Sequence, residues 1–388
     1  MLSKKAILVA AILGLTPSFS GEAKPRTSEP PTVIYDLDDN FDLPALMYLG
    51  QLHKQGLINL KAVTVAISGG SYPGTGLAQT RCFLRKIGLG SVATSDGNLV
   101  GGNSFPKSIR TAVGLGIERA SGCKVPKHPP APEGGAAALI TSILNDATPT
   151  NKVIVVTGGP LTNLAQALEA QPNLASKIKA LYSMGGSTVG GNICCFDAAE
   201  DGVTDANADG VPDHLNNTQE FNFWTDAQAA KRVFDALGGK IYLTELKSTN
   251  DVPLSQAFRL RLDGDQTTPT AAIVDGFAND PENQIGEIDD GFGFLFWWDP
   301  LNAVAATYPG VVTYAHDFVT INEIPNDPDE GQTIGGLNQT VGVSVRRGES
   351  TRTSSDYGAT SCGVNEGPCF HDVFIDGLNG RLNSLSLP

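Results

Sequence analysis

Four aspartates lie within seven residues of the segment VIYDLDDNFDLPALMYL, residues 33–49: Asp36, Asp38, Asp39 and Asp42. An apolar, β-prone run precedes them, and an apolar run with helical spacing follows. Carboxylates this close repel one another unless protons or a cation compensate their charge. A hard divalent cation, which takes about six to eight oxygen ligands, would do so directly. A solvated acidic loop explains this stretch equally well, so both interpretations stay open here.

A glycine-rich turn in VVTGGPLTNLAQAL, residues 155–168, is the second feature. It lacks the Gly-Lys-Ser/Thr ending of a phosphate-binding loop, which argues against nucleotide phosphate binding. The simpler interpretation is a tight strand-to-helix turn with Thr162 or Asn163 near the helix N-cap. The alternative is a backbone carbonyl offered to a cation at the end of the strand.

Two further segments carry acidic and amide side chains. In QEFNFWTDAQAAKRVF, residues 219–234, Glu220 and Asn222 alternate with phenylalanines, so on a strand they would share one face and suit vicinal hydroxyls. The segment is also consistent with an edge strand that runs into a helix at Asp226. In FLFWWDPLNAVAA, residues 294–306, Asp299 precedes a proline at the start of a helical pattern. Taken alone, Asp299 is better explained as a helix cap.

The elements that must position these side chains alternate between strands and helices. Short apolar runs without polar alternation predict strands that are buried on both faces, as in a parallel sheet between helices. The rhythm predicts an α/β fold with a doubly wound, mostly parallel open sheet, Rossmann-like, with loop insertions. Ligands bind such sheets beyond the carboxyl ends of the strands, where the aspartates and both glycine turns fall. The expected strands begin in the segments 32–36, 60–66, 152–157, 178–184 and 239–246, and loops are expected at 323–340 and 346–370.

Taken together and in this order, the four segments resemble the inosine-uridine-preferring nucleoside hydrolase family, as an exported, bacterial-type member. The resemblance covers residues 33–306, with a weaker tail. It implies hydrolysis of the N-glycosidic bond of ribonucleosides to free base and ribose, with one catalytic Ca²⁺. The metal ligands that it implies are Asp36, Asp38, Asp42, Thr157 and Asp299. The sugar contacts that it implies are Met184, Asn192, Glu220 and Asn222.

The resemblance also assigns roles in the reaction. Asp38 would act as the general base that takes a proton from the attacking water. Many members have a histidine immediately before the later aspartate, where this chain has Trp298. Indole is no general acid, but it can stack on a flat base. This resembles the purine-preferring branch, and Trp298 could instead only line the pocket.

The chain departs from the family pattern at two places. The usual pair of adjacent aspartates is a single Asp42, flanked by Phe41 and Leu43. Asp42 matches either the first or the second member of the pair; we prefer the second, because it keeps the helix phase and a metal ligand, and Asp39 would then take a neighbouring role. The turn TGGPLTN is one residue longer than usual, so the carbonyl ligand would come from Thr157 or Gly158.

An aspartate-rich insertion at about residues 187–219 contains a second motif. The stretch DANADGVPD fits the start of a calcium loop, with Asn216 instead of glutamate at the twelfth position, so it is no full EF-hand. We expect a structural Ca²⁺ there, with a solvated acidic loop as the alternative. The expected ligands are Asp205, Asn207, Asp209, Val211 and Asp213.

Composition limits the remaining classes of function. The net charge is −14, from 41 acidic and 27 basic residues, which argues against nucleic-acid binding. Lys4 and Lys5 precede ten apolar residues, Ala6 to Leu15, too few to span a bilayer. We therefore expect a signal peptide over residues 1–23, no membrane span, a periplasmic or extracellular location, and one catalytic domain over residues 31–388. The oligomeric state stays open, with a homo-oligomer among the alternatives.

The six cysteines lack C-x-x-C spacing, so disulfides are favoured over zinc for an exported chain. The preferred pairs are Cys362–Cys369 and then Cys82–Cys123. A different class of function stays open as well: a catalytically weak or inactive, Ca²⁺-stabilised riboside-binding protein. The departures at Asp42 and Trp298 support that alternative, and the retained carboxylates argue against it.

Overall fold

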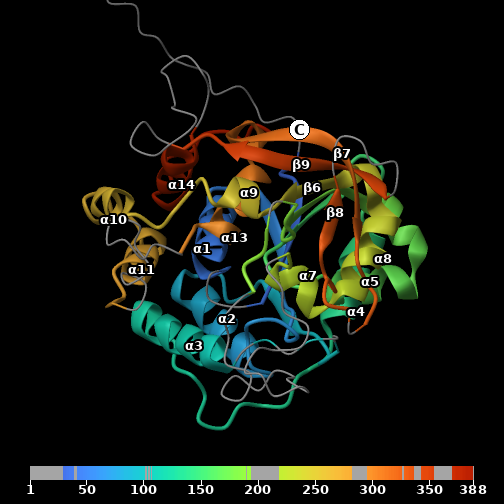
Figure 1. Ribbon diagram of the computed structural model, residues 1–388. Coiled ribbons are helices and arrows are strands. Elements are labelled where there is room, and N and C mark those ends of the chain that lie inside the picture. Colours follow the sequence, from blue (N-terminus) through green and yellow to red (C-terminus); the bar gives the residue numbers. More distant parts are fainter. Residues whose placement is uncertain are drawn as a thin grey trace, which may run out of the picture.

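One mixed sheet forms the centre of the computed structural model (Figure 1). Its strands lie in the order β3-β2-β1-β4-β5-β6-β9-β7-β8 within the described part of the chain. The structure describes residues 29–38, 42–100, 103, 105, 107–188, 190–193, 218–281, 295–325, 327–335, 342–353 and 369–387. The strands are β1 Thr32–Leu37, β2 Asn59–Val65, β3 Ala93–Asp96, β4 Val153–Thr157, β5 Ile178–Met184, β6 Ile241–Thr244, β7 Val312–Ile321, β8 Thr333–Gly335 and β9 Val343–Thr351.

Helices follow most of these strands and cover both faces of the sheet. They are α1 Asp42–Lys54, α2 Thr75–Lys86, α3 Lys107–Ser121, α4 Ala136–Asp146, α5 Thr162–Ala170, α7 Phe221–Thr225, α8 Ala227–Leu237, α9 Leu246–Thr249, α10 Gln256–Asp263, α11 Pro269–Ala278, α13 Trp298–Ala305 and α14 Phe370–Leu378. The strand-helix alternation confirms the predicted doubly wound α/β fold. In the described residues no helix is long and apolar enough to cross a membrane.

The strand order contains a switch point between β1 and β4. From β1 the chain builds outward through β2 and β3, and it then returns to place β4 on the other side of β1. Both neighbours pair with β1 in parallel, and Asp36 lies opposite Thr157 in the register. The helices that follow β1 and β4 diverge at such a point, which leaves a crevice beyond the carboxyl ends of the strands.

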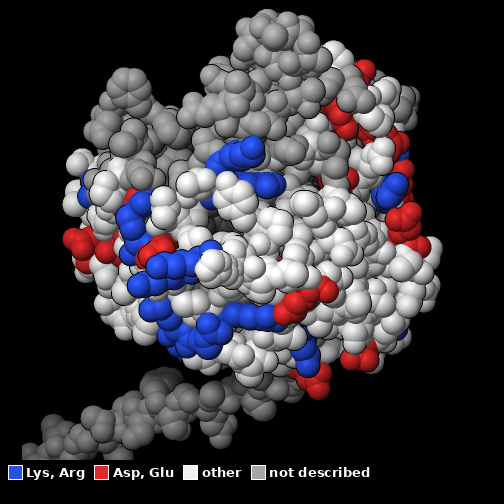
Figure 2. All heavy atoms as spheres, turned by 90° about the horizontal axis from the view of Figure 1, so that it is seen from below, with Lys and Arg blue, Asp and Glu red and all other residues white. Residues whose placement is uncertain are grey.

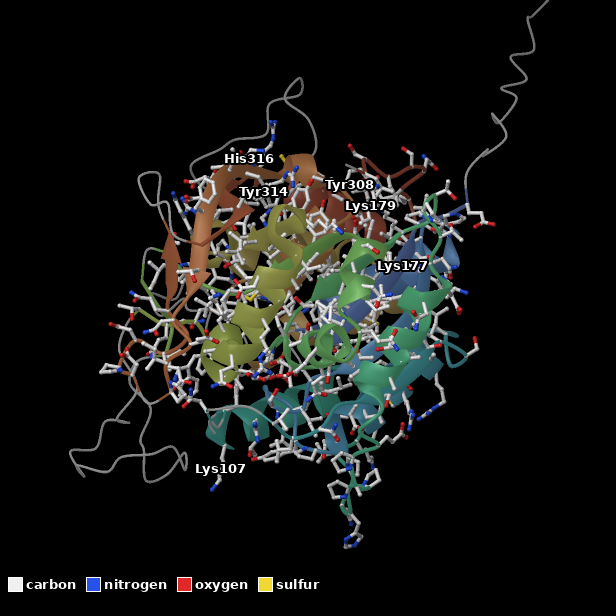
Figure 3. The ribbon with its side chains drawn as sticks, turned by 90° about the vertical axis from the view of Figure 1, so that its right-hand side faces the viewer. Lys107, Lys177, Lys179, Tyr308, Tyr314 and His316 are labelled. Carbon is white, nitrogen blue, oxygen red and sulfur yellow. A yellow bond between two sulfur atoms is a disulfide. The ribbon has the colours of Figure 1, made fainter. Side chains whose placement is uncertain are left out.

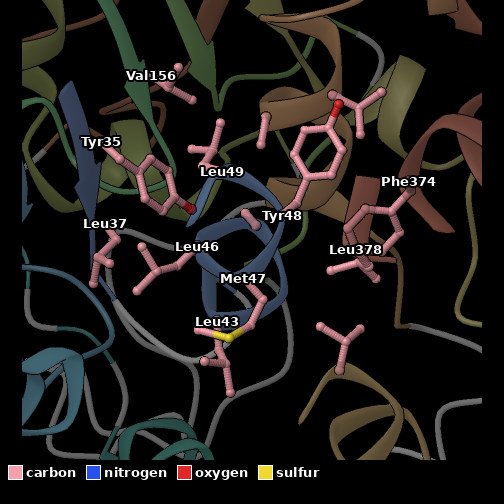
Figure 4. Close-up of a cluster of buried hydrophobic side chains, with 14 of the residues drawn as sticks. Tyr35, Leu37, Leu43, Leu46, Met47, Tyr48, Leu49, Val156, Phe374 and Leu378 are labelled. Atoms are coloured by element: carbon pink, nitrogen blue, oxygen red, sulfur yellow. The ribbon is translucent and has the colours of Figure 1, made fainter. Parts of the chain in front are cut away.

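Alternate residues of β1 enter two separate cores. Val33, Tyr35 and Leu37 belong to the cluster that also contains α1, α13 and α14, whereas Ile34 belongs to the cluster with α5 and α8. This follows from the period of two along a strand. Figure 4 shows the first cluster around α1. The two faces are therefore both apolar, as the unbroken hydrophobic run predicts.

Helix α1 is buried over almost its whole length, with every residue from Asp42 to Leu52 buried. Pro44 sits in its first turn, where a missing N–H leaves no helix hydrogen bond unmade. A helix that is buried all round has little freedom to shift. It therefore fixes the position of its first residue, Asp42, at the carboxyl edge of the sheet.

The C-terminal part of the chain differs from the expectation. Residues 346–351 belong to β9, and β8 lies within the segment 323–340, so the prediction of loops there was wrong in part. β9 pairs with β6 in parallel and with β7 antiparallel. The polar side chains of the segment obscured the strand: Arg347, for example, is buried among Glu245 and Asp317.

One predicted disulfide is present. Cys82 on α2 and Cys123, just beyond α3, are bonded with an S–S distance of 2.05 Å. Cys362 lies outside the described residues, so the pair Cys362–Cys369 stays a prediction. The expected signal peptide, residues 1–23, also lies outside them, as does most of the insertion.

The excess of acidic residues is not evenly spread over the surface. Figure 2 shows a group of Lys and Arg side chains on the face seen from below, although the net charge of the chain is −14. Figure 3 shows Lys107, the first residue of α3, at the end of the molecule opposite to Tyr314 and His316 of β7.

The fold makes a prediction about acid stability through His371 on α14. Burial is the main reason why the pKa of His371 falls from 6.5 to about 3. Between these two pH values His371 is protonated in the unfolded chain but not in the folded chain. The free energy of unfolding should therefore decrease as the pH falls from about 6.5 towards 3. At about pH 4.5 this single group should cost about 3 kcal/mol. Urea unfolding of wild type and His371→Phe at about pH 7 and pH 4.5 measures the difference.

The variant should lose less stability between the two pH values than wild type does. All other titrating groups are shared and cancel in the comparison. Equal losses in the two proteins would contradict the assignment.

Candidate active site

The site begins where β1 and β4 end side by side. The backbone N–H of Gly158 donates to the carbonyl of Asp36 at 2.9 Å, continuing the pairing of the two strands by one residue. Asp36, Asp38, Asp42, Asp299 and Thr157 are all buried. The sequence-predicted metal ligands are thus taken out of water at one edge of the sheet.

Asp38 is enclosed by three glycines. The N–H of Gly70 donates to its Oδ2 at 3.1 Å. A Cβ atom on Gly69 would lie 1.8 Å from that same oxygen, and one on Gly159 would lie 2.4 Å from the Cβ of Asp38. Side chains at these glycines would therefore displace the carboxylate. The extra glycine of the turn at residues 157–163 has a steric role that the sequence did not reveal.

Asp42 and Asp299 flank Gly158. A Cβ atom there would come within 1.8 Å of Oδ1 of Asp42 and 2.9 Å of Oδ1 of Asp299. Asp42 is the first residue of α1, and its Oδ2 accepts from the N–H of Asp38 at 2.8 Å. Asp299 is the second residue of α13, and the N-cap residue is Trp297, so the interpretation of Asp299 as the cap was wrong. The fold thus brings together carboxylates from the first and the last of the four segments identified in the sequence.

A tyrosine that the sequence analysis missed lies among these acids. Tyr35 on β1 is fully buried, and its hydroxyl donates to Oδ1 of Asp42. Burial raises its pKa well above 10, and the nearby charges of Asp42, Asp299 and Asp38 raise it further. Tyr35 therefore remains a neutral donor. Leu43, next to Asp42, packs into the apolar core, so no second carboxylate stands there.

Asp36 points to a different set of partners. Its Oδ1 accepts from Thr64 at 2.6 Å and from Asn163 at 2.9 Å, while Oδ2 has no hydrogen-bond partner in the described residues. Burial raises its pKa to about 6, against the opposing effect of these two hydrogen bonds. Thr162 and Asn163 are the first two residues of α5, directly after its N-cap residue Leu161, so the predicted strand-to-helix turn is confirmed. Both side chains bond to buried acids, Thr162 to Asp226 and Asn163 to Asp36.

Two observations bear on whether the predicted ligands could hold a metal ion. In the described residues no three His, Cys, Asp or Glu side chains lie close enough together to hold a metal ion. The available atoms are nevertheless all oxygens, the ligands that a hard cation prefers. Asp36 Oδ2 is buried without a hydrogen bond in the described residues, and the lack of a side chain at Gly158 lets Oδ1 of Asp42 and Oδ1 of Asp299 approach its backbone. The residue types therefore fit a hard divalent cation.

Glu220 was expected on a strand, but it caps a helix. It is the N-cap residue of α7, and its carboxylate accepts from the N–H groups of Asn222 and Phe223. Its Oε2 also accepts from Gly186 N–H at 2.8 Å. Burial raises its pKa, although these backbone donors oppose the shift. The helix cap directs Glu220 and Asn222 towards the end of β5. The sequence analysis had expected the two side chains to share a face because they alternate along a strand.

Asn222 connects two strand ends. Its amide donates to the carbonyl of Gly158 at 2.9 Å and to that of Met184 at 3.1 Å, and it contacts the sulfur of Met184 at 3.2 Å. Asn192 lies next to this group, because its N–H donates to the carbonyl of Gln219 at 3.0 Å. Its Oδ1 is buried and has no hydrogen-bond partner in the described residues. The four predicted sugar contacts thus lie near one another.

A second amide, Asn302 on α13, was missed. It donates to the carbonyls of Thr157 at 2.9 Å and Tyr182 at 3.1 Å, and it accepts from the hydroxyl of Thr244 at 2.9 Å. Asn302 thereby ties the helix that carries Asp299 to β4, β5 and β6. Its place three residues after Asp299, and so on the same side of the helix, was the available signal.

The two neighbouring tryptophans have different surroundings. Trp297 is buried against Phe258 and Phe374, with ring centroids at 4.8 and 5.6 Å. Trp298 is only half-buried and lies 5.8 Å from Phe296. Trp298 is therefore partly exposed, whereas Trp297 belongs to the core. Asp39 and the expected second calcium ligands, Asp205, Asn207, Asp209, Val211 and Asp213, lie outside the described residues.

Residues 33–361 match the family model of the inosine-uridine preferring nucleoside hydrolases. The chain belongs to this family. It is therefore a nucleoside hydrolase, an enzyme that cleaves the N-glycosidic bond of ribonucleosides.

Solved structures of nucleoside hydrolases share its fold. The enzyme of Bacillus anthracis has 23% identity and a TM-score of 0.63, covering 90% of this chain and 99% of that one. The plant enzyme PpNRh1 has 19% identity and a TM-score of 0.67, with coverage of 90% and 99%. A purine-preferring ribonucleoside hydrolase of Gardnerella vaginalis has 20% identity and a TM-score of 0.62, with coverage of 90% and 98%.

A curated relative matches over a shorter stretch. An uncharacterized protein of Schizosaccharomyces pombe is 32% identical over 119 residues, which is 30% of this chain and 28% of that protein. The match therefore spans less than a third of the relative.

Gly158 offers a direct test of the site. Gly158→Ala should lower kcat/KM for nucleosides by about 100-fold or more, since its methyl group would overlap Asp42 and approach Asp299. Gly310→Ala is the matched control, because a Cβ there meets nothing within 4 Å. Steady-state kinetics of both variants, with melting temperatures to confirm folding, decide the matter. A folded, fully active Gly158→Ala enzyme would place the chemistry elsewhere.

Proposed function

We propose that this nucleoside hydrolase is Ca²⁺-dependent and uses the strand-end aspartates for both metal binding and proton transfer. The observation that carries the proposal is the position of Asp42 and Asp299 next to Gly158, with the backbone N–H of Asp38 donating to the carboxylate of Asp42. Buried carboxylates so close together need compensating positive charge.

The cation would be held by Asp38, Asp42, Asp299 and the carbonyl of Thr157, with Asp36 Oδ2 as a further oxygen. Ca²⁺ bound there would supply charge that orients a water molecule and lowers its pKa. The position of Asp42 beside Asp299 supports its match to the second aspartate of the family pair. Tyr35 supports this role, because it stays protonated and keeps one donor on the carboxylate of Asp42.

Asp38 would accept the proton of the attacking water as general base. Gly70 N–H holds one of its oxygens, which limits rotation of the carboxylate. Glu220, Asn222, Asn192 and Met184 would bind the ribose. Positive charge develops on the sugar as the N-glycosidic bond breaks, and buried carboxylates next to it stabilise that charge.

Trp298 would contact the departing base. A half-buried indole next to Asp299 can stack on a flat ring. It cannot donate a proton as an imidazole does, so stacking is its contribution to leaving-group departure. This favours purines, which present the larger ring surface.

Two further expectations belong to the proposal. The leader-like residues 1–23 support export, and the aspartate-rich insertion supports a second, structural Ca²⁺. The alternative function, a riboside-binding protein with little or no catalysis, differs from the main proposal in turnover and not in binding.

Calcium dependence is the first test. We expect ribose release from nucleosides with Ca²⁺ and a loss of turnover with a chelator that excess Ca²⁺ reverses. Asp38→Asn should lower kcat by about 1,000-fold or more, since the amide cannot take the proton, while riboside binding measured by calorimetry remains. Wild-type protein that binds ribosides but releases no ribose would support the binding alternative.

Base preference is the second test. Trp298→Ala should lower kcat/KM for purine nucleosides by about 10-fold, and Trp298→Phe should retain most of it, because stacking contributes about 0.5–1.5 kcal/mol. Wild type and both variants are compared on inosine and uridine. An equal loss of kcat/KM on inosine and uridine would mean that Trp298 only lines the pocket and does not select the base.

A further inference from the structure

The turn Ser68–Gly70, which follows β2, lies directly against Asp38. The N–H of Gly70 donates to Asp38 Oδ2 at 3.1 Å. A Cβ atom on Gly69 would lie 1.8 Å from the same oxygen, so the backbone of the turn approaches the carboxylate as closely as glycine permits. The orientation of Asp38 therefore depends on where this turn is held.

Arg110 on α3 holds the turn from one side. Its Nε donates to the carbonyl of Gly69 at 3.0 Å, and its Nη2 donates to the carbonyl of Ser68 at 3.3 Å. The guanidinium lies over the ring of Tyr72, 5.7 Å from the centroid. Charged donors make stronger hydrogen bonds to carbonyls than neutral donors do.

The charge of Arg110 has no acidic partner at ion-pair distance in the part of the chain that the structure describes. Burial lowers its pKa, and the nearby charges of Tyr72 and Asp38 oppose that shift. The described contacts of Arg110 are therefore mainly with the backbone, because it donates to two adjacent carbonyls. These carbonyls belong to the same turn whose Gly70 N–H contacts Asp38.

Hydrogen bonds hold the turn from the other side as well. The hydroxyl of Ser68 lies 3.0 Å from that of Thr162, which in turn donates to Asp226 at 2.7 Å. Asp226 is itself fixed as the N-cap of α8, where it accepts from Ala229 N–H. The turn is thus clamped between α3 and the helices α5 and α8.

We propose that Arg110 is a positioning residue for Asp38: it fixes the Ser68–Gly70 turn so that the Gly70 N–H holds the carboxylate in its working orientation. The inference rests on the proposed role of Asp38 as base and metal ligand. Arg110 itself would contact neither the substrate nor the reacting atoms. Its loss should therefore affect kcat and metal binding more than KM.

A cavity beside Arg110 makes chemical rescue feasible. It has a volume of about 100 Å³ and is lined by Gly70, Tyr72, Gln79, Arg110 and Thr111, among others. Removal of the arginine side chain would enlarge this space. A guanidinium ion could then enter it and donate to the two carbonyls as Arg110 does.

The experiment compares Arg110→Ala, Arg110→Lys and the control Arg81→Ala. Arg81 on α2 also donates to a backbone carbonyl, that of Thr94 at 3.2 Å, but makes no contact with the turn in the described residues. Arg110→Ala should lower kcat by about 10- to 100-fold, as loss of a supporting residue typically does, and change KM by no more than about threefold. Arg110→Lys should recover part of the loss.

Guanidinium chloride, at concentrations far below those that unfold the protein, should restore part of kcat in Arg110→Ala but not in wild type or Arg81→Ala. Sodium chloride at the same ionic strength should not. Calorimetric titration with Ca²⁺ should show affinity about 10-fold weaker in Arg110→Ala, again partly restored by guanidinium. The inference is overturned if kcat and Ca²⁺ affinity match those of Arg81→Ala, or if guanidinium restores neither.

The two levels of proposal fail in different ways. Wild type that releases no ribose refutes the proposed catalysis, and the Ca²⁺ titration then still tests the positioning of Asp38. Active wild type with unaffected Arg110 variants refutes only the positioning role. Melting temperatures of all variants separate either result from unfolding.

Discussion

The burial of several carboxylates at one edge of a parallel sheet is the constraint on which the rest of this structure depends. Asp38, Asp42 and Asp299 are each at most 5% exposed, and their charges repel in a medium that water cannot screen. Three neighbouring donors lower that cost: the phenol of Tyr35, the N–H of Asp38 and the N–H of Gly70 all donate to these oxygens. Hydrogen bonds alone do not neutralise the negative charge of several buried carboxylates, and a bound cation would do so.

The sheet topology explains why the acids meet. The switch in strand order between β1 and β4 places the ends of two adjacent strands side by side, while the helices that follow them diverge. Two buried amides then link the strand ends to the helices. Asn222 binds the carbonyls of Gly158 and Met184, and Asn302 binds those of Thr157 and Tyr182. Each amide satisfies carbonyls that a sheet edge would otherwise leave without partners.

Glycine has a steric function throughout this region. At Gly69, Gly158 and Gly159 the backbone approaches carboxylates so closely that any side chain would displace them. Backbone N–H groups can then serve as donors in a site from which larger side chains are excluded. Helix α1 completes the arrangement, because its nearly complete burial fixes Asp42 relative to β1. The acidic residues are thus positioned by the backbone and by the packing of the core.

The sequence by itself determined the alternation of strands and helices and the identity of the acids, because hydrophobic period and residue type are local properties. It misassigned Glu220 to a strand, since two alternating polar residues look alike on a strand and in a helix cap. It missed β9, whose charged Arg347 is neutralised by distant Glu245 and Asp317. Only the tertiary structure decided that Tyr35 donates to Asp42, that Asn302 binds the carbonyls of Thr157 and Tyr182, and that Arg110 binds the turn next to Asp38, because these contacts depend on how the chain folds in three dimensions.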